Sequence, residues 1–191
     1  MILSLILSAF LFAVPADTLE IPPQPERSDE EPEVLAEVAA GEVRFRGTTQ
    51  IETFYGETSE IRGFVNPETG EFKFTVNMAS LTTGNSRRDR NMHSDYLKTE
   101  EWPQSVFSGV IQDIHLLEED AENNVKATGE FTIRDVTREV EIEGEIQRSR
   151  GEWNLSATFT LLHSDFSISR ARFLFVRVRD EVEVTVSARL R

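Results

Sequence analysis

Residues 71–78 read Glu-Phe-Lys-Phe-Thr-Val-Asn-Met, a stretch in which polar and apolar side chains alternate without a break. In a β-strand, residues two apart lie on the same face, so this stretch has one apolar face and one polar face. Such a strand is typical of an antiparallel sheet that covers a core on one side and meets water on the other. The stretch therefore predicts antiparallel β structure.

The same alternation recurs in three later segments, over residues 139–146, 153–161 and 181–190. Further strands are expected near residues 43–54, 57–65, 105–117, 125–134 and 173–178. Turn-forming sequences separate the strands at residues 66–70, 122–124 and 148–151. About eight strands at this spacing predict an all-β domain, a meander that closes into an antiparallel β-barrel and so hides its edges.

Residues 84–98 interrupt the β pattern. A short helix is expected over residues 87–93, with Ser86 as its N-cap and Asp89 as the acidic partner three residues on. Within four residues of this segment lie three cations, Arg87, Arg88 and Arg90, in a protein that is acidic overall. They form either a cationic rim beside the barrel mouth, which meets an anionic or polar ligand head, or an ion pair that fixes the helix. The two interpretations are compatible.

The N-terminal region differs in composition from the rest of the chain. Residues 1–16 are apolar and end in a small residue, Ala16, which predicts a secretory signal peptide. The stretch is shorter than the ~20 residues that span a bilayer, so no stable membrane insertion is expected after cleavage. Residues 17–40 hold four Pro and eight acids, which predicts a disordered acidic linker. The folded domain is expected over residues 41–191, in the periplasm or secreted.

Composition excludes several classes of function. The net charge is −14, and an acidic surface repels phosphate backbones, which argues against nucleic-acid binding. The chain has no Cys, which excludes disulfides, thiol chemistry and Cys-containing zinc sites. It has 13 Phe, apolar rings that need no hydrogen-bond partner and so suit a dry core or a dry pocket.

No set of residues predicts catalysis or metal binding. The three histidines, His93, His115 and His163, have no metal-ligand spacing and are expected at the surface or the mouth. The glutamates that alternate over residues 139–145 are the solvated face of a strand. The chain has no nucleophile elbow, phosphate loop or dinucleotide fingerprint. We therefore expect that the protein is not an enzyme and that it uses no cofactor and no metal.

The apolar inner face is the candidate ligand-binding lining. Its residues are Phe72, Phe74, Val76, Phe107, Phe131, Ile133, Phe159 and Leu161. An eight-stranded barrel can be filled by its own side chains or can hold one small ligand. The sequence leaves both alternatives open.

Three ordered motifs resemble those of the YceI-like family. The first runs from MASLTTGNSRRD at residues 78–89, through MHSDYL at 92–97, to EWPQSVFSG at 101–109. The second is ATGEFTIRDVTREV at 127–140 and the third is SDFSI at 164–168. In two places this chain departs from the family pattern, because Asp135 and Ser167 stand where Gly is common. The departure at Ser167 suggests that the backbone there need not adopt positive φ.

The resemblance implies a lipocalin-like extended antiparallel barrel that is exported to the periplasm. Some family members bind polyisoprenoid lipids such as the tails of quinones or prenyl phosphates, and some are dimeric, so a homodimer is one state that the resemblance allows. The family is not known as a class of enzymes. The leading hypothesis is therefore a carrier for an isoprenoid-type chain.

Two other hypotheses fit the sequence. The first is a structural or protein-interaction module with a side-chain-filled barrel, whose acidic residues 17–40 act as a docking arm. The second and weaker hypothesis is a lipid-modifying enzyme that uses Asp89, His93 or His163. An elongated void inside the barrel favours the carrier over the filled module, and a turnover that is lost in His163→Ala with the fold intact would favour the enzyme.

Overall fold

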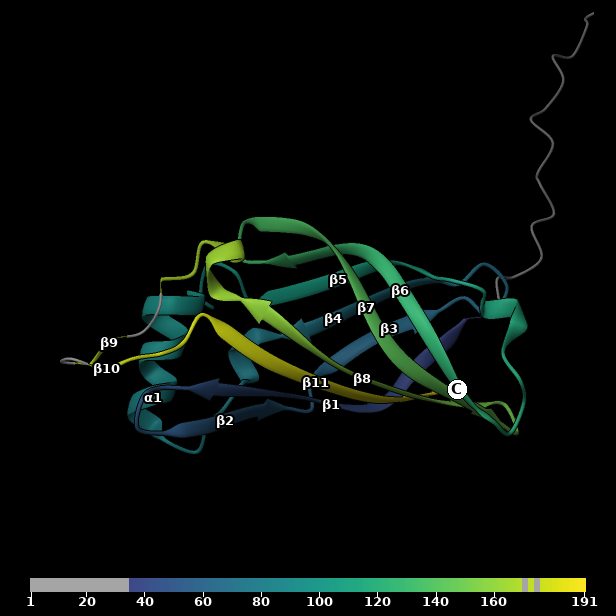
Figure 1. Ribbon diagram of the computed structural model, residues 1–191, viewed down its shortest axis with the longest axis horizontal. Helices are drawn as coiled ribbons and strands as arrows, with labels where there is room; N and C mark the ends of the chain where they lie inside the picture. Colours follow the sequence, from purple (N-terminus) through teal and green to yellow (C-terminus); the bar gives the residue numbers. More distant parts are fainter. Residues whose placement is uncertain (1–34, 170–171, 174–175) are drawn as a thin grey trace, which may run out of the picture. The chain divides into compact units, whose positions relative to one another are not determined.

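Eight strands close into one antiparallel barrel in the structure, a computed structural model that describes residues 35–169, 172–173 and 176–191 (Figure 1). The barrel strands are β1 (Ala36–Thr48), β3 (Ile61–Val65), β4 (Glu71–Asn77), β5 (Gln104–Ile111), β6 (Glu122–Ile133), β7 (Val136–Ser149), β8 (Glu152–Leu162) and β11 (Glu181–Leu190). Each pairs with the next, and β11 pairs back with β1. The predicted antiparallel barrel is confirmed.

A ninth strand, β2 (Thr53–Thr58), pairs with the second half of β1. The sequence predicted a single strand over residues 43–54, and this was wrong because the chain turns between Thr48 and Thr53. The turn contains neither Gly nor Pro. Instead, Thr49 Oγ1 accepts hydrogen bonds from the backbone N–H groups of Ile51 and Glu52.

The first barrel strand begins at Ala36 rather than at Gly41, where the sequence placed the start of the domain. Ala36 pairs with Val65 and Val38 pairs with Leu190, so this segment is part of the barrel wall. The register shifts between Val38 and Ala40. The expected signal peptide and residues 17–34 of the expected linker lie outside the described residues.

Two of the three predicted turns are confirmed. At residues 66–70, Asn66 Oδ1 accepts from the backbone N–H groups of Glu68 and Thr69. At residues 148–151, Gly151 supplies the positive φ, 81°, that ends the β7–β8 hairpin turn.

The turn predicted at residues 122–124 is wrong, because β6 has already begun there. The side-chain amide of Asn123 instead donates to the backbone oxygens of Glu118 and Ile146 and so ties the preceding loop to β7. The predicted strand over 105–117 ends at Ile111 and is followed by a short 3₁₀ helix, η3 (Ile114–Leu116). The strand predicted near 173–178 corresponds to β9 (Arg172–Phe173) and β10 (Val176–Arg177), which pair with each other outside the barrel sheet.

The predicted helix is present but longer than expected. A 3₁₀ turn, η1 (Met78–Ser80), leads to α1 (Ser86–Asn91), which continues as a π-helical segment, η2 (Met92–Leu97). Ser86 is not the N-cap. Asn85 caps the helix, because its Oδ1 accepts from the N–H groups of Arg87 and Arg88 at 3.1 Å.

The two ends of the barrel differ. We call the end that carries α1, η2, the turn between β1 and β2, and η4 (His163–Phe166) the mouth (Figure 1). The end that carries the turns at 66–70 and 148–151 is the base. At the base, Val65 and Leu190 are 0% exposed and Ile146 is 1% exposed. These side chains form one cluster with Trp153 and with Ile114 of η3, which closes the base with hydrocarbon.

The wall is not paired along its full length. β7 and β8 pair from Ser149–Glu152 to Gly144–Ala157 and then separate toward the mouth (Figure 1). The buried ring of Phe166 from η4 forms one cluster with Ile133 and Ile168, and Val136 of β7 and Leu161 of β8 pack against this cluster. A helical insertion therefore fills the wall where the strand pairing stops.

Candidate functional site

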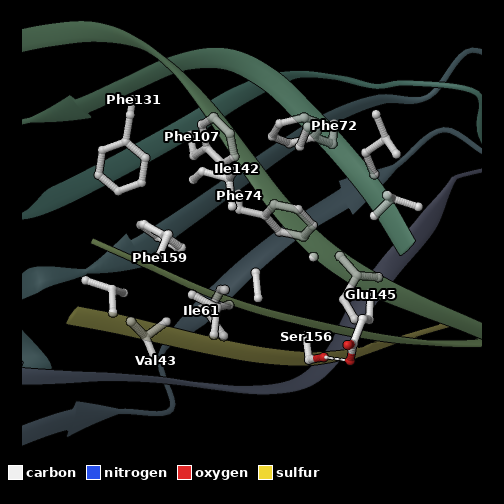
Figure 2. A pocket seen from close by; sticks show the side chains of 18 of the residues that line it. Val43, Ile61, Phe72, Phe74, Phe107, Phe131, Ile142, Glu145, Ser156 and Phe159 are labelled. Carbon is white, nitrogen blue, oxygen red and sulfur yellow. Dashed lines mark hydrogen bonds between the residues drawn. The ribbon is translucent and has the colours of Figure 1, made fainter. Parts of the chain in front are cut away.

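The barrel interior holds a small cavity of about 130 Å³ midway along the strands (Figure 2). Its lining is almost entirely apolar and comes from all eight barrel strands, with Phe72, Phe74, Phe107, Phe131 and Phe159 as its largest side chains. The polar exception lies at one edge, where Ser156 Oγ donates to Glu145 Oε2 at 3.3 Å. We call this space the deep cavity.

A larger cavity of about 540 Å³ lies at the mouth. Its walls come from β1, β2, the helix over residues 86–97, β8 and the segment over residues 163–169. Phe45, Phe54, Leu81, Met92 and Leu161 give it an apolar surface. Its volume lies within the ~300–1,000 Å³ of typical small-molecule sites. We call this space the mouth cavity.

The two cavities adjoin, because five residues line both. The shared residues are Val43, Val76, Ser105, Phe131 and Val184. Ser105 is buried and its Oγ donates to the carbonyl of Thr132 at 2.8 Å, so its polarity is satisfied by the backbone. The junction of the two cavities, which we call the constriction, therefore presents an apolar surface to a chain that passes through it.

A ladder of aromatic rings follows the inner wall. The Phe72 and Phe107 ring centroids are 4.7 Å apart, and Phe107 lies 5.5 Å from Phe131. Phe131 in turn lies 6.2 Å from Phe159 and 5.8 Å from Phe166. Rings at these separations attract one another beyond the effect of their burial. Phe131 is thus held by three neighbours at the junction of the two cavities.

The mouth cavity owes part of its width to two glycines. Phe45 of β1 faces Gly56 of β2, and Gly47 of β1 faces Phe54 of β2. A Cβ at either glycine would collide with the ring opposite, so each glycine leaves room for the ring across the ladder. The rings of Phe45 and Phe54 meet edge to face, with centroids 6.3 Å apart. The glycines let both rings line the cavity instead of filling it.

Arg88 joins the helix to the β1–β2 turn. Its Nη2 lies 2.7 Å from Glu52 Oε1, and its guanidinium lies over the ring of Phe54, 4.3 Å from the centroid. Both partners belong to the hairpin of β1 and β2, which forms another wall of the mouth cavity. This contact, which we call the latch, joins two walls of the cavity, and it supports the interpretation in which one Arg pairs with a neighbouring acid.

Asp89 fixes the loop that precedes the helix. Its Oδ1 accepts from the backbone N–H and the hydroxyl of Thr83, and its Oδ2 accepts from the hydroxyl of Thr82. Burial alone would raise the pKa of Asp89, but these hydrogen bonds lower it below the ordinary aspartate value, with help from nearby His93. The carboxylate therefore contributes stability in its charged form.

Arg134 ties the two helical segments of the mouth together. Its Nη1 donates to the carbonyls of Tyr96 and Ser167, both at 3.4 Å, and its guanidinium lies over Trp102. Ser167 has a φ of 53° and so adopts the left-handed conformation that we predicted it need not adopt. That expectation was wrong: the backbone that ends η4 requires positive φ whether or not the residue is Gly.

All eight residues of the expected lining border a cavity. Those at the deep cavity are Phe72, Phe74, Val76, Phe107, Phe131 and Phe159, and those at the mouth cavity are Val76, Phe131, Ile133 and Leu161. Of the expected polar rim, Arg87 and Arg88 line the mouth cavity, whereas Arg90 is exposed and borders neither cavity. The interior is thus filled at the base and hollow toward the mouth.

Sequence reasoning missed the apolar part of the site that lies on β1, β2 and the helix. Phe45 and Phe54 border the mouth cavity, as do Met92 and Tyr96 and the 80%-exposed Ile51. The Phe45–Gly56 and Gly47–Phe54 pairs were a usable signal, because a glycine opposite an aromatic ring is a recognisable cross-strand pair.

Both histidines near the mouth are engaged in structural hydrogen bonds. His93 Nε2 donates to the carbonyl of Leu81 at 3.0 Å, and His163 Nδ1 lies within 3.2 Å of the carbonyls of Arg179 and Asp180. Within the described ranges, no three His, Cys, Asp or Glu side chains gather as metal ligands. Among the same residues, no helix is both long and apolar enough to cross a membrane.

Two curated proteins resemble part of this chain. UPF0312 protein plu2095 of Photorhabdus laumondii is 30% identical over 82 residues, and Protein YceI of Escherichia coli is 28% identical over 82 residues. Each alignment covers 42% of this chain and 40% of the relative. The chain therefore aligns with less than half the length of these curated relatives.

Two solved structures share the fold. A polyisoprenoid-binding domain from Saccharophagus degradans superimposes with a TM-score of 0.71 at 11% identity, over 82% of this chain and 97% of that domain. BcnA of Burkholderia cenocepacia gives a TM-score of 0.62 at 15% identity, over 78% and 95% of the two chains. At these identities the likeness concerns the fold. The YceI-like domain model, however, matches residues 36–190, the full length of the barrel, and the chain therefore belongs to the YceI-like family.

Proposed function

We propose that this protein is an exported carrier that holds an isoprenoid-type lipid, such as the tail of a quinone or a prenyl chain, and catalyses no reaction on it. The single observation that carries the proposal is the pair of adjoining apolar cavities, which together run from the mouth to the middle of the barrel. The polyisoprenoid-binding name of the Saccharophagus degradans domain supports the choice of ligand.

The energetics of burial favour such a ligand. Each CH₂ moved from water into an apolar cavity contributes about 0.8 kcal/mol, so a chain of several isoprene units can bind tightly without hydrogen bonds. The head group would remain at the mouth, beside Arg87 and the Arg88–Glu52 pair. A polar or anionic head would meet cationic side chains there, while the tail lies in the dry interior.

Export would place the carrier in an aqueous compartment, where an isoprenoid tail needs a protein cover. A signal peptide over residues 1–16 would deliver the barrel to the periplasm, where a lipid tail between two membranes must be kept from water. In this proposal, residues 17–34 link the signal sequence to the barrel, and the mature protein is not inserted in a membrane. The oligomeric state, including a homodimer, is open to measurement by light scattering.

Native mass spectrometry tests the proposal. Purified protein is incubated with a prenyl alcohol of about four isoprene units, a length chosen from the cavity volumes, and freed of excess lipid by gel filtration. We expect a mass increase of one lipid per barrel. A protein that remains empty at every lipid concentration would contradict the proposal.

A matched pair of variants localises the binding. Val76→Phe places a ring in the constriction between the two cavities, whereas Thr75→Phe adds the same ring at the next position on β4, which borders neither cavity. We expect Val76→Phe to lower lipid uptake strongly and Thr75→Phe to leave it near the wild-type level. Equal uptake by both variants would place the lipid outside the barrel.

A further inference from the structure

We infer that the packed base acts as a ruler, so that the barrel accepts isoprenoid chains of about four to five units and excludes the additional units of longer chains. This inference rests on the proposed function and adds a ligand length to it. Two observations carry it: the volumes of the cavities and the packed floor that closes the deep cavity toward the base. The deep cavity also shares five lining residues of β6, β7 and β8, among them Glu145 and Ser156, with a space of about 1020 Å³ whose lining is mostly polar, so that space offers an isoprenoid chain no dry continuation.

The volumes set the length. A dry protein cavity of about 150 Å³ holds one benzene molecule, which has six carbons. By that proportion the deep cavity, at about 130 Å³, holds about one five-carbon isoprene unit. The mouth cavity, at about 540 Å³, holds about four such units. A chain that enters from the mouth therefore fills both spaces with about four to five units, depending on how deeply its head group sits.

The floor of the deep cavity is rigid. Phe72 is 3% exposed, and its ring packs against Phe107 at 4.7 Å and against Phe74 at 5.6 Å. Phe72 belongs to the same buried cluster as Val65, Ile146 and Leu190. Because packed interiors resist local expansion, a chain end that reaches these rings cannot advance toward the base.

A longer chain must leave its extra units at the mouth. Such units stay in contact with water and add nothing to the apolar area that the barrel buries. Each unit that does fit should tighten binding by at least about tenfold, because it buries five carbons. Affinity should therefore rise steeply with chain length until the cavities are full and then stay level.

A competition experiment between prenyl alcohols of different length tests the proposed limit on chain length. The full chain is incubated with an equimolar mixture of prenyl alcohols of two to nine isoprene units in mild detergent, and bound species are counted by native mass spectrometry. Occupancy should rise up to about four or five units and show no further gain beyond them. A steady rise up to the longest alcohol, or equal binding of all lengths, would overturn the ruler.

Two variants should shift the preferred chain length in opposite directions. Ala127→Leu adds carbons to the wall of the deep cavity and should shorten the preferred chain by about one unit. Phe107→Ala removes a floor ring and should lengthen it, and Phe107→Leu is a milder change for use if the Ala variant folds poorly. Val110→Ala is the matched control, because Val110 lies on the same strand with an exposed side chain.

The possible outcomes distinguish a failure of the proposed length limit from a failure of the proposed carrier function. If no alcohol of any length binds, the proposed function fails and the ruler fails with it. If alcohols bind but Ala127→Leu and Phe107→Leu keep the wild-type length preference, only the ruler fails. A shift of the preference in opposite directions in these two variants, with Val110→Ala unchanged, supports it.

Discussion

At the base of the barrel Val65 and Leu190 are fully buried, whereas at the mouth Phe45, Phe54 and Met92 border an open cavity. Both ends are built from the same eight strands with the same alternation of apolar and polar residues. The difference comes from what closes each end. Tight turns and η3 bring hydrocarbon together at the base, while a helix and the β1–β2 hairpin span a wider opening at the mouth.

The two ends of one sheet thus have different roles: the base stabilises the fold, and the mouth holds the proposed ligand site. Fully buried side chains at the base contribute most of their possible packing energy, since neighbours surround them on all sides. Side chains that border a cavity lack those neighbours on one side, and a bound lipid would supply the missing contacts. The mouth should therefore gain stability from its ligand, and the base should not need it.

The largest expected contrast is between two leucines. Leu190→Ala at the base should lower the free energy of unfolding by about 2–5 kcal/mol, because it leaves a void in a closed cluster. Leu161→Ala at the mouth should cost clearly less, because its side chain is half-buried and already borders a cavity. Urea unfolding of the lipid-free variants measures both, and equal losses would contradict the distinction between base and mouth.

Asp89→Asn should have the next largest effect. Removing the charge weakens three hydrogen bonds from Thr82 and Thr83, for a loss of about 1–3 kcal/mol in the free energy of unfolding. Asp95→Asn is the matched control, since the exposed Asp95 accepts only the neighbouring Ser94 hydroxyl among the described contacts. A larger loss in the control than in Asp89→Asn would show that the Thr82–Asp89 loop is not a fixed element.

The contribution of Asp89 should depend on pH in one direction. Because its pKa in the folded protein is below the ordinary value, the charged form stabilises the fold fully above that ordinary value. The contribution should be lost as pH falls through the lowered pKa. The difference in urea midpoint between the wild type and Asp89→Asn should be constant near neutral pH and shrink in acid. A difference that grows in acid would contradict the assigned pKa shift.

The smallest effect on stability is expected at the latch. Glu52→Gln and Arg88→Ala should each cost less than about 1–2 kcal/mol, because the ion pair is partly exposed and the cation–π contact is modest. Both should nevertheless speed the release of bound lipid, because the latch joins the helix to the hairpin of β1 and β2 at the mouth cavity. Exchange of lipid between loaded and empty protein measures the rate of release. Arg90→Ala, which alters a cation outside both cavities, should exchange at the wild-type rate. Unchanged exchange in the latch variants would show that the helix does not gate the mouth.

Sequence periodicity predicted the barrel and its inner face, but not its volume. The alternation over residues 71–78 and 181–190 identified which side chains point inward, because the period of a strand is a local property. Whether inward side chains meet depends on the distance across the barrel, which is set by distant parts of the chain. Leu190 is packed in the base, and Val184 borders both cavities, although both belong to the same alternating pattern on β11.

Two of the remaining errors share a physical cause. The turn over residues 49–52 has no Gly or Pro, and the hydroxyl of Thr49 organises it. The helix cap is Asn85 rather than Ser86, and Asp89 bonds to Thr82 and Thr83 instead of completing a capping box. In each case a side-chain hydrogen bond to the backbone or to a neighbour decided between alternatives that composition could not separate.

The most direct test of lipid binding at the mouth is a crystal structure of the protein loaded with a prenyl alcohol of about four isoprene units. We expect the chain to enter beside Arg88, pass Phe131 and end against Phe72 and Phe107, while Trp153 and the base keep their positions. A chain bound on the outer face, or an empty barrel under saturating lipid, would contradict the assignment of the two cavities as the binding site.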